Sequence, residues 1–160
     1  MQALSAGVLG VLLVVPGAVT AETAYFVVAQ RIPAPLPPSD AYILPLAAPA
    51  DIAAARALVS GGSSMIVIAR IEEGADGINR NVNAPGMPEW SWHVVEFMRF
   101  DTAAIELCDG SPTLVEQDVK GWIANTGGTI CFWAYTVVAE LPPPEPVQPT
   151  FWGDCTALYR

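Results

Sequence analysis

Two cysteines, Cys108 and Cys131, constrain this chain more than any other feature, because each lies in a hydrophobic, strand-like segment and together they flank one expected helix. The segments around them read "AIELCDGSPTLVEQDV" and "TICFWAYTVVAEL". In an oxidising compartment such a pair is expected to form a disulfide. The bridge would close a short loop, which the chain-entropy model values at roughly 3 kcal/mol. The pattern predicts a small exported domain with one covalent cross-link.

A third cysteine, Cys155, lies in a proline-rich segment near the C-terminus. It leaves an odd number of thiols, so three interpretations stay open. Cys155 is a free thiol, a link to another chain, or the true partner of one of the other two cysteines.

The N-terminus indicates the compartment. The run "LSAGVLGVLLVVPGAVTA" is apolar and uncharged, and it ends in small residues just before Glu22. This is typical of a secretory signal peptide spanning residues 1–21 and cleaved after Ala21. Because no Lys or Arg precedes the apolar core, a retained N-terminal membrane anchor is the alternative. We expect a secreted or periplasmic protein.

The charge balance excludes several kinds of partner. The chain has 7 Lys and Arg residues against 16 Asp and Glu residues, a formal net charge of -9. Nucleic-acid binding needs clustered Lys and Arg to neutralise phosphates, and the same holds for anionic membrane surfaces. We expect no nucleic acid and no membrane contact beyond the possible anchor.

The expected elements follow from hydrophobic periodicity and turn residues. Residues 22–141 are predicted to form one globular domain and residues 142–160 a proline-rich tail. Strands are expected at 24–31, 41–47, 64–73, from Glu89, into Cys108 and from Thr129, the last as a central strand; helices are expected at 49–60 and from Ser111 to Gly121. We therefore predict an α+β fold with an antiparallel sheet of about five or six strands, two short helices and one disulfide.

Several of these segments together resemble a known family. They are "PADIAAARALVSGG" after a strand, "WSWHV", "AIELCDGSPTLVEQDV", and Cys131 and Trp133 near the last strand. In their order and spacing over residues 24–141 they resemble small exported domains grouped with the N-terminal domain of a calmodulin-binding protein from social amoebae. The resemblance implies no established activity. It does not imply calmodulin binding either, because calmodulin targets are typically basic amphipathic helices and neither expected helix is basic.

Catalytic motifs are absent, and His93 is the only histidine. No G-x-S-x-G elbow, H-E-x-x-H, C-x-x-C pair or phosphate-binding loop occurs, so no cofactor and no metal are expected. His93 with Glu96, Glu106 and Asp109 could form an acid and base pair or hold a cation. The alternative is a structural histidine bonded to a neighbouring strand or loop. Asp109 is also suited to shaping the turn before Ser111.

The loop "DGINRNVN" places oxygen-bearing side chains at alternate positions, faintly like a calcium loop. These side chains are Asp76, Asn79, Asn81 and Asn83. An EF-hand loop needs a Glu at its twelfth position, where this chain has Met87. Turn formation is therefore favoured over calcium binding.

Aromatic residues supply the remaining candidates. Trp90, Trp92 and Trp133, with Phe132 and Tyr135 beside them, could line a groove for a sugar or a peptide, and core packing is the alternative. We expect an exported, non-enzymatic binding or interaction module for a protein, peptide or glycan. The alternative is a small hydrolase or inhibitor-like protein that uses the region of His93, Glu106 and Asp109.

Overall fold

The computed structural model describes residues 23–30, 40–61 and 64–142. The predicted signal peptide, Cys155 and nearly all of the predicted tail lie outside these residues. The described elements are, in chain order, β1 (Ala24–Gln30), β2 (Ala41–Leu46), α1 (Pro49–Val59), β3 (Ile66–Glu73), β4 (Trp92–Asp101), the 3-10 helix η1 (Glu106–Cys108), α2 (Pro112–Gln117), α3 (Val119–Thr126), β5 (Thr129–Ile130) and β6 (Tyr135–Glu140).

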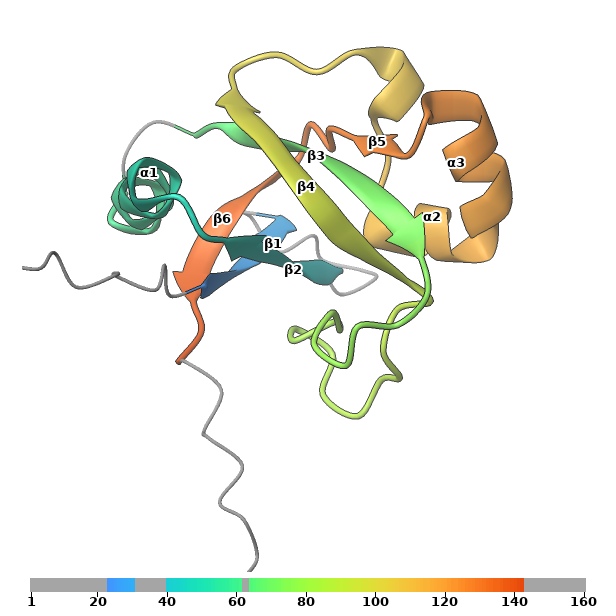
Figure 1. Cartoon of the computed structure of the whole chain (residues 1–160), viewed down its shortest axis with the longest axis horizontal. Coiled ribbons are helices and arrows are strands. Elements are labelled where there is room, and N and C mark those ends of the chain that lie inside the picture. The colour runs from blue at the N-terminus through green and yellow to red at the C-terminus, as the bar shows by residue number, and fades with distance from the viewer. Residues whose placement is uncertain (1–22, 31–39, 62–63, 143–160) are drawn as a thin grey trace, which may run out of the picture.

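The strands form two three-stranded sheets with the orders β2-β1-β6 and β4-β3-β5 (Figure 1). Every strand pair is antiparallel, so the predicted α+β class and strand direction are confirmed. The prediction of one sheet of five or six strands was wrong. A turn at residues 132–135 passes the chain from β5 in one sheet to β6 in the other, so the strands are divided.

The main core lies between the sheets and follows from alternation along the strands. In β1, Phe26 and Val28 point into it, while Val27 and Ala29 point to the opposite face. Helix α1 adds Ala55 and Leu58 to the same core. An ion pair between Arg56 and Glu140, 2.7 Å between Nη2 and Oε1, joins α1 to β6.

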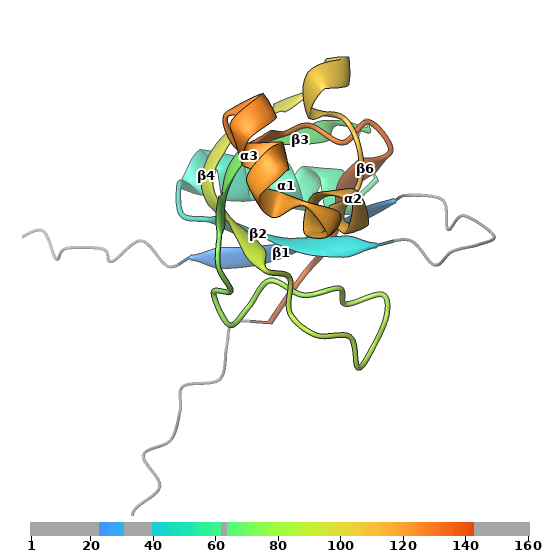
Figure 2. The ribbon, with the colours of Figure 1, turned by 90° about the vertical axis from the view of Figure 1, so that its right-hand side faces the viewer.

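The outer face of the β2-β1-β6 sheet is covered by the loop between β3 and β4. Ile78 and Val82 of this loop pack on Val27, Ala29 and other apolar residues of the sheet. Both views place the loop on the side of β1 and β2 away from β3 (Figures 1 and 2). The loop is therefore a structural layer of the domain.

Strand β4 alternates between core and surface only when two residues are set aside. Its pairing with β3 skips Val95 and Met98, which lie at irregularities of the register and are exposed. Without them, Trp92 and Val94 face the core and their neighbours face outward. Bulges of this kind interrupt an edge strand and hinder its pairing with a further strand.

The region between the two cysteines differs most from the prediction. The expected strand into Cys108 is the 3-10 helix η1, and the expected single helix is two, because Asp118 ends α2 and caps α3. Gly121 lies inside α3, which ends instead at Gly127 with a φ of 64°. Strand β6 is at a sheet edge, whereas β1 occupies the centre.

Candidate binding surface

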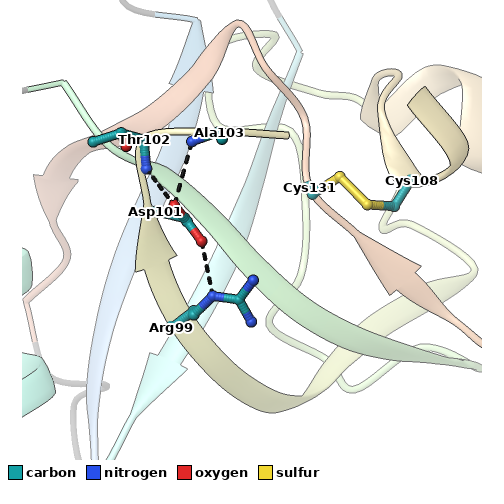
Figure 3. A network of polar contacts seen from close by, with 6 residues as sticks. All are labelled: Arg99, Asp101, Thr102, Ala103, Cys108 and Cys131. Atoms are coloured by element: carbon teal, nitrogen blue, oxygen red, sulfur yellow. Dashed lines mark hydrogen bonds and ion pairs between the residues drawn. A yellow bond between two sulfur atoms is a disulfide. The ribbon is translucent and has the colours of Figure 1, made fainter. Parts of the chain in front are cut away.

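The predicted disulfide between Cys108 and Cys131 is present, with a Cα–Cα distance of 5.2 Å (Figure 3). It joins η1 to the segment that follows β5, rather than joining a long helix to a central strand. The backbone N–H of Cys131 also donates to the carbonyl oxygen of Cys108 at 2.8 Å. Two chain segments are thereby held side by side.

The chain enters this region through a turn at Asp101, at the end of β4. The Asp101 carboxylate accepts hydrogen bonds from Arg99 Nε at 2.8 Å and from the backbone N–H of Thr102 at 2.7 Å and Ala103 at 3.3 Å (Figure 3). The hydrogen bond from Arg99, followed by the one from Thr102, lowers the pKa of Asp101. The segment from residue 102 to Cys108 is therefore fixed at both ends.

Beyond the disulfide, a tight turn displays Trp133. The N–H of Tyr135 donates to the carbonyl of Phe132 at 3.1 Å, and the rings of these two buried residues meet edge to face at 5.4 Å. Trp133, between them, is 60% exposed. Its backbone N–H donates to Asp109 Oδ1 at 2.7 Å. The backbone that carries the indole is thus held from both sides.

Other exposed apolar side chains surround this turn. Ile105 and Leu107, next to the disulfide in sequence, are 65% and 61% exposed. Leu114 is also exposed and lies over Gly110, where a Cβ would come 3.0 Å from Leu114 Cδ2. We call Ile105, Leu107, Leu114 and Trp133 the Trp133 patch. Exposed apolar residues gathered in one region are typical of interaction surfaces.

The charges within the Trp133 patch are acidic. Glu106 and Asp109 are exposed on η1 and just after it. Among the residues that the structure describes, no Lys or Arg forms an ion pair with either carboxylate. Sequence reasoning had assigned Glu106 and Asp109 to a site with His93, whereas the structure places them beside Trp133.

His93 itself lies at the start of β4, whereas Glu106 and Asp109 follow the end of that strand. Its Nδ1 is 2.8 Å from the carbonyl oxygen of Gly74, and Glu96 is paired with Arg70 at 3.0 Å. No hydrogen bond or ion pair joins His93 to Glu96, Glu106 or Asp109 in the described part of the chain. Within those same residues, no cluster of three or more His, Cys, Asp or Glu side chains could hold a metal ion.

Two of the predicted binding residues, Trp90 and Trp92, belong to the core instead. They are 7% and 0% exposed, because the inward positions of the strand carry them, and they stack on each other at 6.2 Å. Trp90 Nε1 donates to the carbonyl of Ala41 at 2.8 Å. Neither indole offers a face to a surface ligand, so Trp133 alone of the three is available for binding.

The asparagines of the loop bind backbone. Asn79 Oδ1 accepts from the N–H of Ile43 at 2.9 Å, and Asn81 Oδ1 accepts from the N–H of Ala41 at 3.2 Å. Both donors lie on β2, an edge strand. Asp76 Oδ1 likewise accepts from the N–H of Ile78 and of Asn79. The alternate spacing of these side chains therefore serves to pair the edge of a strand.

Comparison with known families gives a match over residues 22–144 to the family described as the BP-74 N-terminal domain. The chain belongs to this family. The match confirms the resemblance inferred from the sequence, and it includes both sheets and the disulfide. No curated protein and no solved structure matches the chain. Within the described residues, no helix has the length and apolar character needed to cross a membrane.

Proposed function

We propose that this member of the family is an exported, non-enzymatic binding domain that recognises a protein partner through the Trp133 patch. The observation that carries the proposal is the exposed indole of Trp133 on a turn held by Asp109 and by two buried rings. Tryptophan is prominent among the residues that dominate binding energy at protein interfaces. A backbone fixed before binding also lowers the entropy lost on association.

The surroundings of Trp133 indicate the chemistry of the partner. Ile105, Leu107 and Leu114 are aliphatic, which favours the apolar side chains of a protein over a glycan. Glu106 and Asp109 add negative charge to a chain whose formal net charge is -9. Electrostatic complementarity therefore favours a partner segment in which Lys or Arg flanks an apolar side chain.

Two observations support the remaining parts of the proposal. A disulfide, together with the signal-like N-terminus, favours export to an oxidising compartment. The placement of His93 against Gly74, away from Glu106 and Asp109, favours binding over hydrolysis.

An array of peptides tests the proposal. It presents one set of apolar residues flanked either by Lys and Arg or by Asp and Glu, and it is probed with the full chain purified in oxidised form. We expect binding to the basic set, and Trp133→Ala should weaken it by roughly tenfold or more. Glu106→Gln should weaken binding less and reduce its dependence on salt.

The matched control is Met98→Ala, which removes an exposed apolar side chain from β4, outside the patch. It should leave peptide affinity unchanged. Equal binding of the acidic and basic sets would refute the predicted charge preference. Equal binding by the Trp133→Ala variant and the unsubstituted chain would refute the site.

A further inference from the structure

A cavity of about 200 Å³ lies where the loop between β3 and β4 meets the ends of β1 and β6. We call it the Arg80 cavity; its lining residues are Tyr25, Gly77, Ile78, Arg80, Leu141 and Pro142. This loop and η1 lie at opposite ends of the molecule in both views (Figures 1 and 2). The cavity is therefore separate from the Trp133 patch and does not rest on the function proposed for that surface.

The walls of the Arg80 cavity are fixed by hydrogen bonds. On the strand side, the N–H of Leu141 donates to the carbonyl of Tyr25 at 2.8 Å. On the loop side, Asp76 Oδ1 accepts from the N–H of Ile78 at 2.8 Å, and Asn79 anchors the loop to β2. Gly77 adopts a φ of 77°, a left-handed conformation that glycine tolerates well. The cavity is thus formed before any ligand binds.

Arg80 differs from the other cationic residues that the structure describes. Its side chain is exposed and makes no ion pair within 4.0 Å with another described residue, although Glu89 lies opposite it in an isolated β-bridge. The other described cations all pair with carboxylates; they are Arg56, Arg70, Arg99 and Lys120. A guanidinium left unpaired among the described residues of so acidic a chain is a site for an external anion. Its planar fork matches a carboxylate in a bidentate arrangement.

We propose that the Arg80 cavity binds a small organic carboxylate. The guanidinium of Arg80 pairs with the carboxylate, while the Tyr25 ring, Ile78 and Leu141 contact the apolar body of the ligand. The cavity is smaller than the range of about 300 to 1,000 Å³ typical of drug-sized ligands. A body of roughly one ring therefore fits it.

The test uses benzoate as the probe and its neutral analogue benzamide as the comparison. Methyl resonances of Ile78 and Leu141 are followed by NMR in the full chain during titration. We expect saturable shifts with benzoate and a dissociation constant at least tenfold higher for benzamide. Arg80→Gln should weaken benzoate binding by roughly tenfold, because it removes a charge-assisted bidentate pair.

Arg70→Gln is the matched control, since it removes a guanidinium from the outer face of β3, outside the cavity lining. It should leave benzoate binding unchanged. The absence of saturable shifts at millimolar benzoate would overturn the proposal. Equal affinity for benzamide, or unchanged affinity in Arg80→Gln, would overturn it as well.

Discussion

Tyr42 is the residue whose environment differs most from water. Its side chain is buried against Trp92 and Phe132, with ring centroids 5.8 and 5.9 Å away. Burial, followed by the charge of Tyr135, raises the pKa of Tyr42 well above its ordinary range. The folded state therefore holds the phenol proton more tightly than the unfolded state does. Stability from this group is fully present below the unfolded pKa of about 10 and is lost as the pH rises above it.

We predict that the free energy of unfolding falls by about 1.4 kcal/mol from this group between neutral pH and pH ~11. Urea unfolding followed by circular dichroism across this range measures the fall. The control is Tyr42→Phe, which keeps the ring and removes the titrating hydroxyl. Its stability should decline less steeply with pH, and an identical decline in both proteins would contradict the assignment.

At the scale of elements, the loop between β3 and β4 acts as a side-chain extension of the sheet. Asn79 accepts from the N–H of Ile43 and donates to the carbonyl of Trp92 at 2.6 Å, and it is 1% exposed. Asn79→Ala would leave two buried backbone groups without partners. We predict a loss of about 1 to 3 kcal/mol in the free energy of unfolding. Asn125→Ala, at an exposed position of α3, should change it by less than about 0.5 kcal/mol.

Native-state hydrogen exchange adds a local readout to the Asn79 test. The amide of Ile43 should lose its protection in Asn79→Ala, because the Asn79 carbonyl oxygen is its hydrogen-bond acceptor. If that amide stays protected and stability is unchanged, the loop does not pair the edge of β2.

The elements that sequence reasoning located correctly have strong local signals. Strands β1 and β3 are rich in β-branched and aromatic residues, and α1 begins with Pro49 and carries Asp51 in its first turn. Helix η1 was missed because a short apolar run such as "AIELC" does not distinguish helix from strand. The turn displaying Trp133 was missed because "FWAY" contains no Gly, Pro, Asn or Asp, and the turn is held by Asp109, distant in sequence.

The same contrast applies to the candidate sites. The sequence named Trp133, Glu106 and Asp109, but it assigned them to two different sites. Their proximity depends on the disulfide and on the division of the strands into two sheets, both of which are long-range features. Arg80 was not considered at all. Its distinguishing property is the absence of an ion-pair partner among described residues, which only the folded arrangement shows.

At the scale of the whole molecule, the disulfide lies at one end of the fold, whereas the main core spans both sheets. Cys108 and Cys131 belong to a small cluster with Ile66 and Ile68, separate from the core that contains Phe26, Trp92 and Val137. Their removal should therefore loosen one end of the molecule before the rest. Stability is not uniform within a domain, and local opening costs less than global unfolding.

We predict that the double variant Cys108→Ala/Cys131→Ala unfolds with a free energy lower by roughly 3 kcal/mol, since it releases the cross-linked loop. Hydrogen exchange should show the largest loss of protection at the amides of Cys108 and of residues 131–135, because the backbone bonds there depend on the two segments staying together. The amides of β1, at the centre of its sheet, should lose only what the global destabilisation requires. Equal loss in β1 and at residue 131 would show that the disulfide stabilises the domain as one cooperative unit, and the Trp133 patch could then not open locally.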